Sequence, residues 1–243
     1  MRNVVVTGAS RGIGLAIAKK LSGAGYGVIA VARKRTDQLD AASAEAANNG
    51  GAIRFTPFDL GEVDKMQNFV AGLRKSYGAI YGLVNNAGIG TEGQLSLMPN
   101  VKIAELLHIN TVAPIVLTKY VVRGMMAGGG GRVVNVASIV AFTGYSGLSV
   151  YSATKASLVG FTRSLAREVG RMGVNVNAIA PGFLDTEMTE GMSDGQRAKV
   201  ARRSALQRLP VVEDVANSVE FLLGDGARSI TGTVLTVDAG STA

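Results

Sequence analysis

The sequence predicts an α/β protein with a Rossmann-type, doubly wound, seven-stranded parallel sheet that carries helices on both faces. Seven short runs rich in β-branched residues alternate with stretches of helical periodicity along the chain. The runs are apolar throughout, which is typical of strands covered on both faces. Hydrophobic residues make up 47% of the 243 residues, enough to bury a sizeable core. We therefore expect a single domain over residues 1–243.

The expected elements follow one another in a regular order. The strands are Val4 to Thr7, Gly27 to Ala32, Ala52 to Pro57, Ile80 to Asn85, Arg132 to Val136, Val174 to Ile179 and Val234 to Val237. The helices are Ile13 to Ala24, Asp37 to Asn48, Glu62 to Tyr77, Pro99 to Met126, Val150 to Arg171 and Val212 to Leu223. The connection from Phe183 to Pro210 is longer and more polar than the others, so we expect it to form a lid over a substrate site.

The composition excludes several kinds of site. The chain has no cysteine and one histidine, so disulfides, thiolate nucleophiles and multi-histidine metal sites are excluded, and no metal is expected. His108 falls within a long helical pattern, where we expect a packing or solvated role. The lack of cysteine is compatible with a reducing compartment, and we expect a cytoplasmic protein.

Neither a leader nor a membrane span is expected. Met1 and Arg2 run straight into the first strand and leave no room for a secretory signal. The most apolar stretch, Thr111 to Val122, contains Pro114 and Lys119, so we expect no run of the ~18 apolar residues that cross a bilayer. The net charge of +7 is compatible with an acidic carrier, a membrane surface or nucleic acid, but the sequence contains no nucleic-acid-binding module. We expect neither a nucleic acid nor a membrane as partner.

A glycine-rich loop, Thr7 to Gly14, joins the first expected strand to the first expected helix. Glycines there let the backbone turn sharply and approach a pyrophosphate, while the amino terminus of the helix supplies N–H donors. The spacing is G-x-x-x-G-x-G rather than the familiar G-x-G-x-x-G. Such a turn by itself is often only structural, but its place after the first strand of a βαβ unit predicts a dinucleotide site.

The residues after the second expected strand indicate which dinucleotide is bound. A site that prefers NAD places an acid there against the ribose 2′-hydroxyl. This chain has Arg33, Lys34 and Arg35 instead, and an arginine can bind a 2′-phosphate through charge-assisted hydrogen bonds. We therefore expect NADP(H) with Arg33 as the main contact. The alternative is a solvated basic loop, which suits Lys34 and Arg35 better than Arg33.

Tyr151 and Lys155 are four residues apart in an expected helix and so share one face of it. An ammonium beside a phenol favours the phenolate, so we expect Lys155 to lower the pKa of Tyr151, which could then act as an acid or base. A pair of this kind alone is usually a surface pair. Ser138 ends the fifth expected strand, where open α/β sheets place their ligands, and its hydroxyl could bind the reacting oxygen, although a serine there often only caps a turn.

With these motifs, the chain resembles the short-chain dehydrogenase/reductase family over nearly its whole length. The resemblance rests on Thr7 to Gly14, Asn85 to Gly88, Ser138, the Tyr151 and Lys155 pair, and Pro181 to Gly182. It implies that Tyr151 transfers the proton, that Lys155 assists it and binds the nicotinamide ribose, and that Ser138 orients the substrate oxygen. It also implies that Asn110 anchors a water that links the lysine to solvent.

The resemblance places Asp59 against the adenine, Leu60 and Asn86 beside the adenosine half, and Leu184 and Thr186 near the nicotinamide. It also identifies Arg11 as a basic residue often carried by members that prefer NADP. The expected cofactor-binding residues are Gly8, Ser10, Arg11, Gly12, Ile13, Gly14, Arg33, Asp59, Leu60, Asn86, Ala87, Gly88, Tyr151, Lys155, Pro181, Gly182, Leu184 and Thr186.

Within the family, the chain is most similar to bacterial 3-oxoacyl-[acyl-carrier-protein] reductases, notably at Ala166 to Val169, Asn175 to Asn177 and Ala180 to Phe183. This similarity implies reduction of a 3-oxoacyl thioester carried on acyl carrier protein or coenzyme A, and a homotetramer. The chain departs from those reductases in two places. Gly128 to Gly131 replaces a basic stretch that is implicated in carrier docking in those reductases, and Ile89 to Glu92 replaces their more usual sequence after the Asn-Ala-Gly motif. An NADP-dependent dehydrogenase of a polyol, sugar or other small secondary alcohol is the alternative, and a non-catalytic dinucleotide sensor is the third hypothesis.

Overall fold

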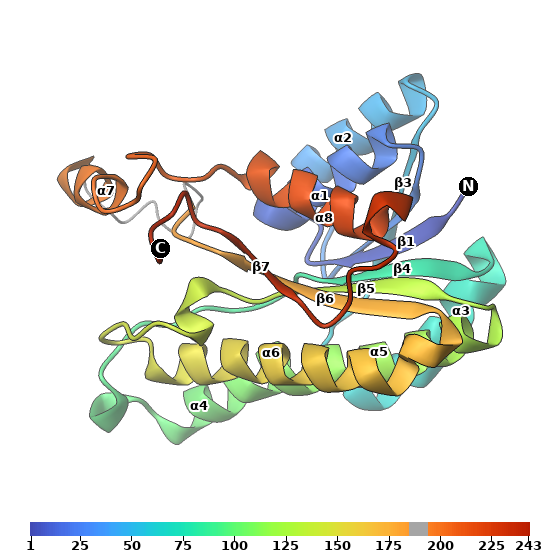
Figure 1. The fold of residues 1–243 in the computed structure, drawn as a ribbon. Coiled ribbons are helices and arrows are strands. Elements are labelled where there is room, and N and C mark those ends of the chain that lie inside the picture. Colours follow the sequence, from blue (N-terminus) through green and yellow to red (C-terminus); the bar gives the residue numbers. More distant parts are fainter. Residues whose placement is uncertain (185–193) are drawn as a thin grey trace.

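The computed structural model describes residues 1–184 and 194–243 of the chain. Seven parallel strands form one sheet in the order β3-β2-β1-β4-β5-β6-β7 (Figure 1). Their bounds are β1 (Asn3–Thr7), β2 (Gly27–Ala32), β3 (Ala52–Pro57), β4 (Ile80–Asn85), β5 (Gly131–Val136), β6 (Val174–Pro181) and β7 (Val234–Val237). The predicted fold class is confirmed.

Helices cover both faces of the sheet, with α1, α2 and α8 on one face and α3 to α6 on the other (Figure 1). Their bounds are α1 (Gly12–Gly23), α2 (Asp37–Asn48), α3 (Met66–Tyr77), α4 (Asn100–Leu107), α5 (Ala113–Ala127), α6 (Ser149–Val169), α7 (Asp194–Ala201) and α8 (Val212–Leu223). Alternate residues of β1 face opposite ways, so Val4 and Val6 enter the core beneath α1 and α8, while Val5 enters the core beneath α3 and α5. Burial on both faces explains why the strand is apolar throughout.

The predicted helix from Pro99 to Met126 is divided in the structure. A π-helical turn, His108–Val112, separates α4 from α5. Pro114 stands in the first turn of α5, directly after this π-helical turn, and the helical path continues through it. A single π-helical turn leaves the spacing of apolar residues almost unchanged, which is why the sequence predicted one continuous helix.

In the part of the chain that the structure describes, one helical stretch, Asn100–Ala127, is long and apolar enough to cross a membrane by length and composition alone. The mean hydropathy of its most apolar window is 1.3, and 33% of that window is buried. The expectation that Pro114 and Lys119 would interrupt such a run is therefore wrong. Leu117 and Val121 of this stretch are buried against the sheet, as in a covering helix of an α/β protein.

The long connection between β6 and α8 contains α7, which lies beyond the edge of the sheet (Figure 1). The sequence prediction treated this connection as a lid and did not place a helix in it. Residues 185–193, including the predicted nicotinamide contact Thr186, lie outside the described residues. The lid remains a prediction.

Candidate active site

The predicted phosphate loop lies between β1 and α1 and depends on its glycines. Gly8 and Gly12 adopt positive φ values of 65° and 53°, which side chains disfavour. A Cβ atom on Gly14 would lie 2.2 Å from the carbonyl oxygen of Gly8, so only glycine allows α1 to pack this closely on the loop. Arg11 is the N-cap residue of α1, and its side chain does not cap the helix. This cradle fits a pyrophosphate, which would meet backbone N–H groups and the positive end of the helix dipole.

The end of β4 is locked against this loop by Thr7. The Thr7 hydroxyl accepts hydrogen bonds from the backbone N–H groups of Asn86 (3.0 Å) and Ala87 (3.0 Å). The Asn86 side-chain amide donates in turn to the Thr7 carbonyl oxygen at 2.9 Å. The structure thus joins the end of β1 to Asn86 and Ala87, after β4, on one side of the predicted cofactor site. Sequence reasoning did not assign a role to Thr7.

The basic residues after β2 differ in their surroundings. Arg33 and Lys34 are exposed, and neither forms an ion pair with another described residue. Arg35 is already engaged, because it pairs with Asp40. The Thr36 hydroxyl donates to the Ser10 carbonyl oxygen at 2.7 Å and so holds this basic loop beside the phosphate loop. This arrangement fits the predicted role of Arg33 at a 2′-phosphate, next to Ser10 and Arg11.

The predicted adenosine contacts after β3 lie at the same edge of the sheet. The Phe58 N–H donates to the Ala32 carbonyl oxygen at 3.0 Å, so this segment runs beside the end of β2. Asp59 is exposed and accepts a hydrogen bond from the Gly61 N–H at 2.9 Å, while Leu60 is half-buried against the core. His108, for which no catalytic role was predicted, contacts the Gly61 carbonyl oxygen at 2.8 Å.

The predicted proton-transfer residues meet at the carboxyl end of β5. Lys155 is buried, and its Nζ donates to the Val136 carbonyl oxygen at 2.9 Å, which ties α6 to the strand. The same Nζ lies 5.7 Å from the centre of the Tyr151 ring. Ser138 begins two residues after Val136, and its hydroxyl accepts from the Val140 N–H at 3.4 Å. The serine therefore caps a turn, which was the alternative role, and it follows β5 directly, where the substrate site was predicted.

Asn110 connects this centre to the end of β4. It occupies the π-helical turn, is buried, and exchanges two hydrogen bonds with the backbone of Ile89, at 2.9 and 2.8 Å. Its amide also donates to the Thr154 hydroxyl at 3.3 Å. A Cβ atom on Gly88 would lie 3.2 Å from Asn110 Oδ1 and 3.5 Å from Lys155 Nζ, so these three residues converge. π-Helical turns are frequent at functional sites because they redirect side chains and backbone groups.

Burial dominates the acid-base properties of the pair. It raises the pKa of Tyr151 to about 12 and lowers the pKa of Lys155 to about 8. The expectation that Lys155 lowers the Tyr151 pKa is therefore wrong. Desolvation of the phenolate is the larger effect, and it acts in the opposite direction.

The predicted nicotinamide contacts follow β6. Pro181 and Leu184 are buried, and the Gly182 N–H donates to the Val237 carbonyl oxygen at 2.9 Å. Sequence reasoning missed an aromatic group beside them: Tyr145 meets Phe183 edge to face, with ring centres 5.4 Å apart. Phe142, from the same loop as Tyr145, is 52% exposed. Two large aromatic residues, Phe142 and Tyr145, in the loop after Ser138 were the signal that could have revealed this group.

Comparison with known proteins identifies the family. Residues 2–197 match the short chain dehydrogenase family. The chain is 37% identical over 236 residues to the 3-oxoacyl-[acyl-carrier-protein] reductase FabG of Escherichia coli (strain K12), covering 97% of this chain and 95% of that protein. The corresponding protein of Vibrio harveyi is 38% identical, with the same coverage. The chain belongs to the short-chain dehydrogenase family, as its motifs predicted.

Solved structures agree with this assignment. A gluconate 5-dehydrogenase from Burkholderia cenocepacia J2315 in complex with NADP and tartrate matches with a TM-score of 0.93 at 26% identity, covering 99% of this chain and 95% of that chain. A short chain dehydrogenase from the same organism in complex with NADP matches with a TM-score of 0.92 at 36% identity, covering 100% and 98%. The fold and the family are thus established by independent comparisons.

Proposed function

We propose that this protein uses NADPH to reduce a carbonyl to a secondary alcohol, and that its substrate is a 3-oxoacyl thioester carried on acyl carrier protein or coenzyme A. The observation that carries the proposal is that buried Lys155, beside Tyr151, binds the Val136 carbonyl oxygen at the carboxyl end of β5, two residues before Ser138. The relatives named 3-oxoacyl-[acyl-carrier-protein] reductase support the substrate class, since the chain aligns with them over 97% of its length.

The residues present fit a bound NADPH, which supplies the hydride. The glycine cradle between β1 and α1 holds the pyrophosphate, and Arg33 binds the 2′-phosphate with Arg11 nearby. Gly88 lies where Lys155 and Asn110 converge, beside the expected position of the ribose, and a Cβ there would come within 3.2 Å of Asn110 Oδ1. The relatives solved with NADP support this choice of cofactor.

Tyr151 donates the proton to the substrate oxygen, while the Ser138 hydroxyl orients that oxygen by a hydrogen bond. A tyrosine whose pKa is about 12 holds its proton at neutral pH, which is the form that reduction requires. Lys155, with a pKa of about 8, remains mostly charged at pH 7 and stabilises the phenolate that forms. Asn110 bonds to Ile89, after β4, and to Thr154, in α6. In this proposal it anchors the water that links Lys155 to solvent, from which Tyr151 regains its proton.

The aromatic group favours an apolar substrate over a polyol. Phe142, Tyr145 and Phe183 flank the segments that carry Ser138 and Gly182, and Phe142 and Tyr145 are partly exposed. Aromatic rings gain most by burying apolar or planar groups such as an acyl chain or a thioester. A sugar acid would instead require several hydrogen-bonding side chains in the same place.

A polyol or sugar dehydrogenase is the second candidate. It is favoured by the likeness to the gluconate 5-dehydrogenase solved with NADP and tartrate. A dinucleotide sensor without catalysis ranks third, because the serine, tyrosine and lysine are all present. We also propose a cytoplasmic homotetramer. Its assembly is supported by exposed apolar residues on α4 and on the π-helical turn that follows it, such as Val101, Leu107 and Val112.

A substrate panel tests the proposal. NADPH oxidation is measured with acetoacetyl-coenzyme A, acetoacetyl-acyl carrier protein and free ketones, and NADP reduction with gluconate and other polyols. The proposal requires kcat/KM for the thioesters to exceed that for every other compound by at least about tenfold. Faster turnover of a sugar acid supports the second candidate, and NADPH binding with no turnover of any compound supports the sensor. Light scattering of the purified protein determines the oligomeric state.

A further inference from the structure

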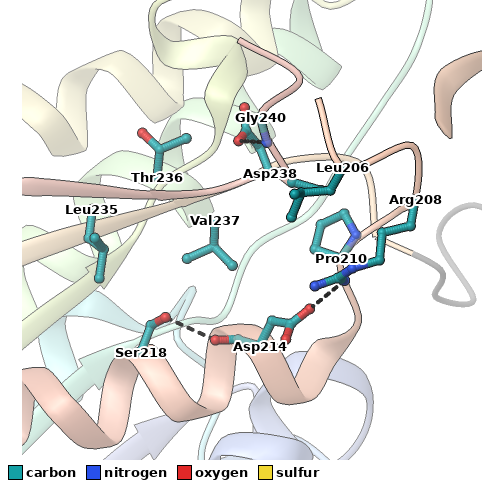
Figure 2. Close-up of a pocket in the computed structure, with 11 residues that line it drawn as sticks. Leu206, Arg208, Pro210, Asp214, Ser218, Leu235, Thr236, Val237, Asp238 and Gly240 are labelled. Carbon is teal, nitrogen blue, oxygen red and sulfur yellow. Dashed lines mark hydrogen bonds and ion pairs between the residues drawn. The ribbon is translucent and has the colours of Figure 1, made fainter. Parts of the chain in front are cut away.

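The carboxyl-terminal turn, Asp238 to Thr242, contacts both ends of the segment that connects β6 to α8. The turn follows β7 and closes one side of a hollow of about 360 Å³ (Figure 2). Figure 2 shows β7 on one side of this hollow, the returning residues Leu206, Arg208 and Pro210 on another, and α8 along its base. The turn therefore lies where the connecting segment leaves the sheet and where it returns.

A single buried carboxylate organises this turn. Asp238 is 7% exposed and accepts the N–H groups of Gly240 (2.8 Å) and Thr242 (2.9 Å). It also accepts the hydroxyls of Ser241 (3.1 Å) and Thr242 (2.7 Å). Burial raises the pKa of the Asp238 carboxyl, but these hydrogen bonds outweigh burial and hold it below its usual value. The carboxylate thus holds the last residues of the chain in one conformation.

In that conformation the backbone of Ala239 has an unfavourable geometry. Ala239 has a φ of 55°, in the left-handed region that non-glycine residues rarely adopt. Because of this turn, the Ala239 carbonyl oxygen accepts the Leu206 N–H at 3.0 Å, and the Gly240 carbonyl oxygen accepts the Ala205 N–H at 3.3 Å. Both bonds hold the returning part of the β6–α8 segment.

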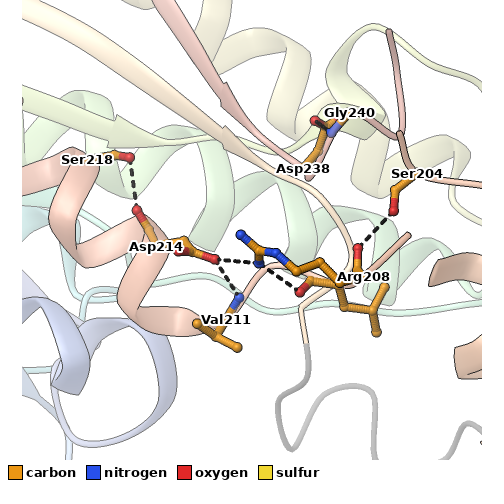
Figure 3. Close-up of polar contacts among 8 residues, drawn as sticks. Ser204, Arg208, Val211, Asp214, Ser218, Asp238 and Gly240 are labelled. Atoms are coloured by element: carbon orange, nitrogen blue, oxygen red, sulfur yellow. Dashed lines mark hydrogen bonds and ion pairs between the residues drawn. The ribbon is translucent and has the colours of Figure 1, made fainter. Parts of the chain in front are cut away.

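The same aspartate abuts the start of the segment. A Cβ atom on Gly182 would lie 2.7 Å from the Cβ atom of Asp238, so the two residues are in close contact. The returning part is tied further along as well, since Arg208 pairs with Asp214 at 3.2 Å and the Ser204 hydroxyl donates to the Arg208 carbonyl oxygen at 2.8 Å (Figure 3). Among these contacts, Asp238 is the group linked to both ends of the segment. It touches Gly182 directly, and the turn that it organises binds Ala205 and Leu206.

We propose that Asp238 is a positioning residue for the reaction: through its turn it sets the relative placement of Gly182 and of Ala205 and Leu206. This inference rests on the proposed function, because Gly182 begins the segment expected to lie against the nicotinamide and the carbonyl substrate. Asp238 acts by positioning the backbone of Gly182, Ala205 and Leu206, and it takes no part in proton transfer. Its loss should weaken use of the carbonyl substrate more than binding of NADPH, since the phosphate loop and Arg33 lie at β1 and β2.

The test compares Asp238→Ala and Asp238→Asn with a matched control, Asp225→Ala. Asp225 is an exposed aspartate that binds Arg2 at 2.9 Å, and among the described residues it has no hydrogen bond or ion pair with either end of the segment. Hydrogen bonds to a charged group correspond to about tenfold or more in an equilibrium. For Asp238→Ala we therefore expect about a tenfold rise in KM for the carbonyl substrate, and a change in the NADPH Kd of less than about threefold. Asp238→Asn keeps one acceptor oxygen and should recover part of the loss, while Asp225→Ala should resemble the unmutated protein.

Hydrogen exchange provides a readout that does not depend on turnover. The Gly182 and Leu206 amides should lose protection about tenfold or more in Asp238→Ala, while amides of β1, β4 and β5 keep theirs. A uniform loss of protection over the sheet, or a KM no higher than that of Asp225→Ala, would overturn the proposal. If the unmutated protein reduces no carbonyl compound, the proposed function fails, and exchange at these two amides alone decides the positioning role.

A second perturbation covers the case in which Asp238→Ala does not fold. A Cβ atom on Gly240 would lie 2.7 Å from the Cβ atom of Ala205, so Gly240→Ala should displace the returning residues. Ala205→Gly removes that clash, whereas the cost of a side chain at the Gly240 φ of 78° remains in both backgrounds. The proposal requires the rise in KM caused by Gly240→Ala to shrink in the double variant. Additive effects of the two substitutions would contradict it.

Discussion

Replacement of Arg33 by aspartate should convert the proposed 2′-phosphate contact into a repulsive one. Arg33 is exposed and pairs with no other described residue, so its guanidinium is free to bind the phosphate. A hydrogen bond to a charged group contributes about 1.5–3 kcal/mol, and exposure places Arg33 toward the lower end of this range. Since about 1.4 kcal/mol corresponds to a factor of ten, kcat/KM for NADPH should fall at least about tenfold, and kcat/KM for NADH should not fall.

The structure supplies a matched control for this experiment. Arg35 is two residues away but already pairs with Asp40, so Arg35→Gln should cost clearly less NADPH use than Arg33→Gln. Steady-state kinetics with both nucleotides, at low and high salt, gives the comparison. Two results would refute the reasoning: activity of the unmutated protein with NADH that equals or exceeds its activity with NADPH, or equal losses from the two glutamine variants.

Four further predictions concern the proton-transfer pair and two arginines, Arg202 and Arg203, in the connection between β6 and α8. Tyr151→Phe removes only the transferable proton, so kcat should fall by about two to four orders of magnitude while the NADPH Kd measured by fluorescence stays nearly unchanged; normal turnover would identify another acid. Lys155→Met removes a buried charge whose pKa is lowered from 10.5 to about 8, so the variant should resist urea better at pH 7, by up to about 3 kcal/mol. This advantage should shrink between pH 8 and 10.5, because the folded wild-type protein binds fewer protons there than the unfolded chain; a constant difference would contradict the shift. Carbonyl reduction should fall as pH rises through about 8, where Lys155 loses its charge, and a flat profile up to pH 10 would exclude this role. Arg202 and Arg203 are exposed, and we expect them to attract the negative charge of a coenzyme A or carrier thioester, so that kcat/KM for such a thioester falls more steeply with salt than kcat/KM for a short uncharged thioester. Reversing both arginines to glutamate should remove this difference; equal responses of the two substrates would exclude electrostatic steering.

Much of the fold and the site follows from the sequence because both depend on local patterns. Strands buried on two faces must be apolar, and parallel strands bring their carboxyl ends to one edge of the sheet. Ser138, Asn86 and Gly8 each end or follow such a strand, so their proximity follows from the topology. The i, i+4 spacing of Tyr151 and Lys155 likewise places them on one face of α6.

The features that were not predicted depend on contacts between distant parts of the chain. Thr7 bonds to Asn86 across 79 residues, and Asn110 bonds to Thr154 across 44. The π-helical turn that directs Asn110 has the same apolar pattern as a regular helix, so periodicity cannot reveal it. The ion pair that engages Arg35 also required the position of Asp40.

The acid-base properties of Tyr151 show why spacing alone does not determine chemistry. The i, i+4 pattern correctly placed a lysine near the phenol, but it carried no information on how deeply the two groups are buried. Burial disfavours the charged form of each, which raises the pKa of Tyr151 and lowers that of Lys155. A phenol that retains its proton is a poor base and a competent acid toward an oxygen that acquires negative charge. The same burial that contradicts the expected pKa shift therefore leaves Tyr151 with its proton at neutral pH, which is the form that reduction of a carbonyl requires.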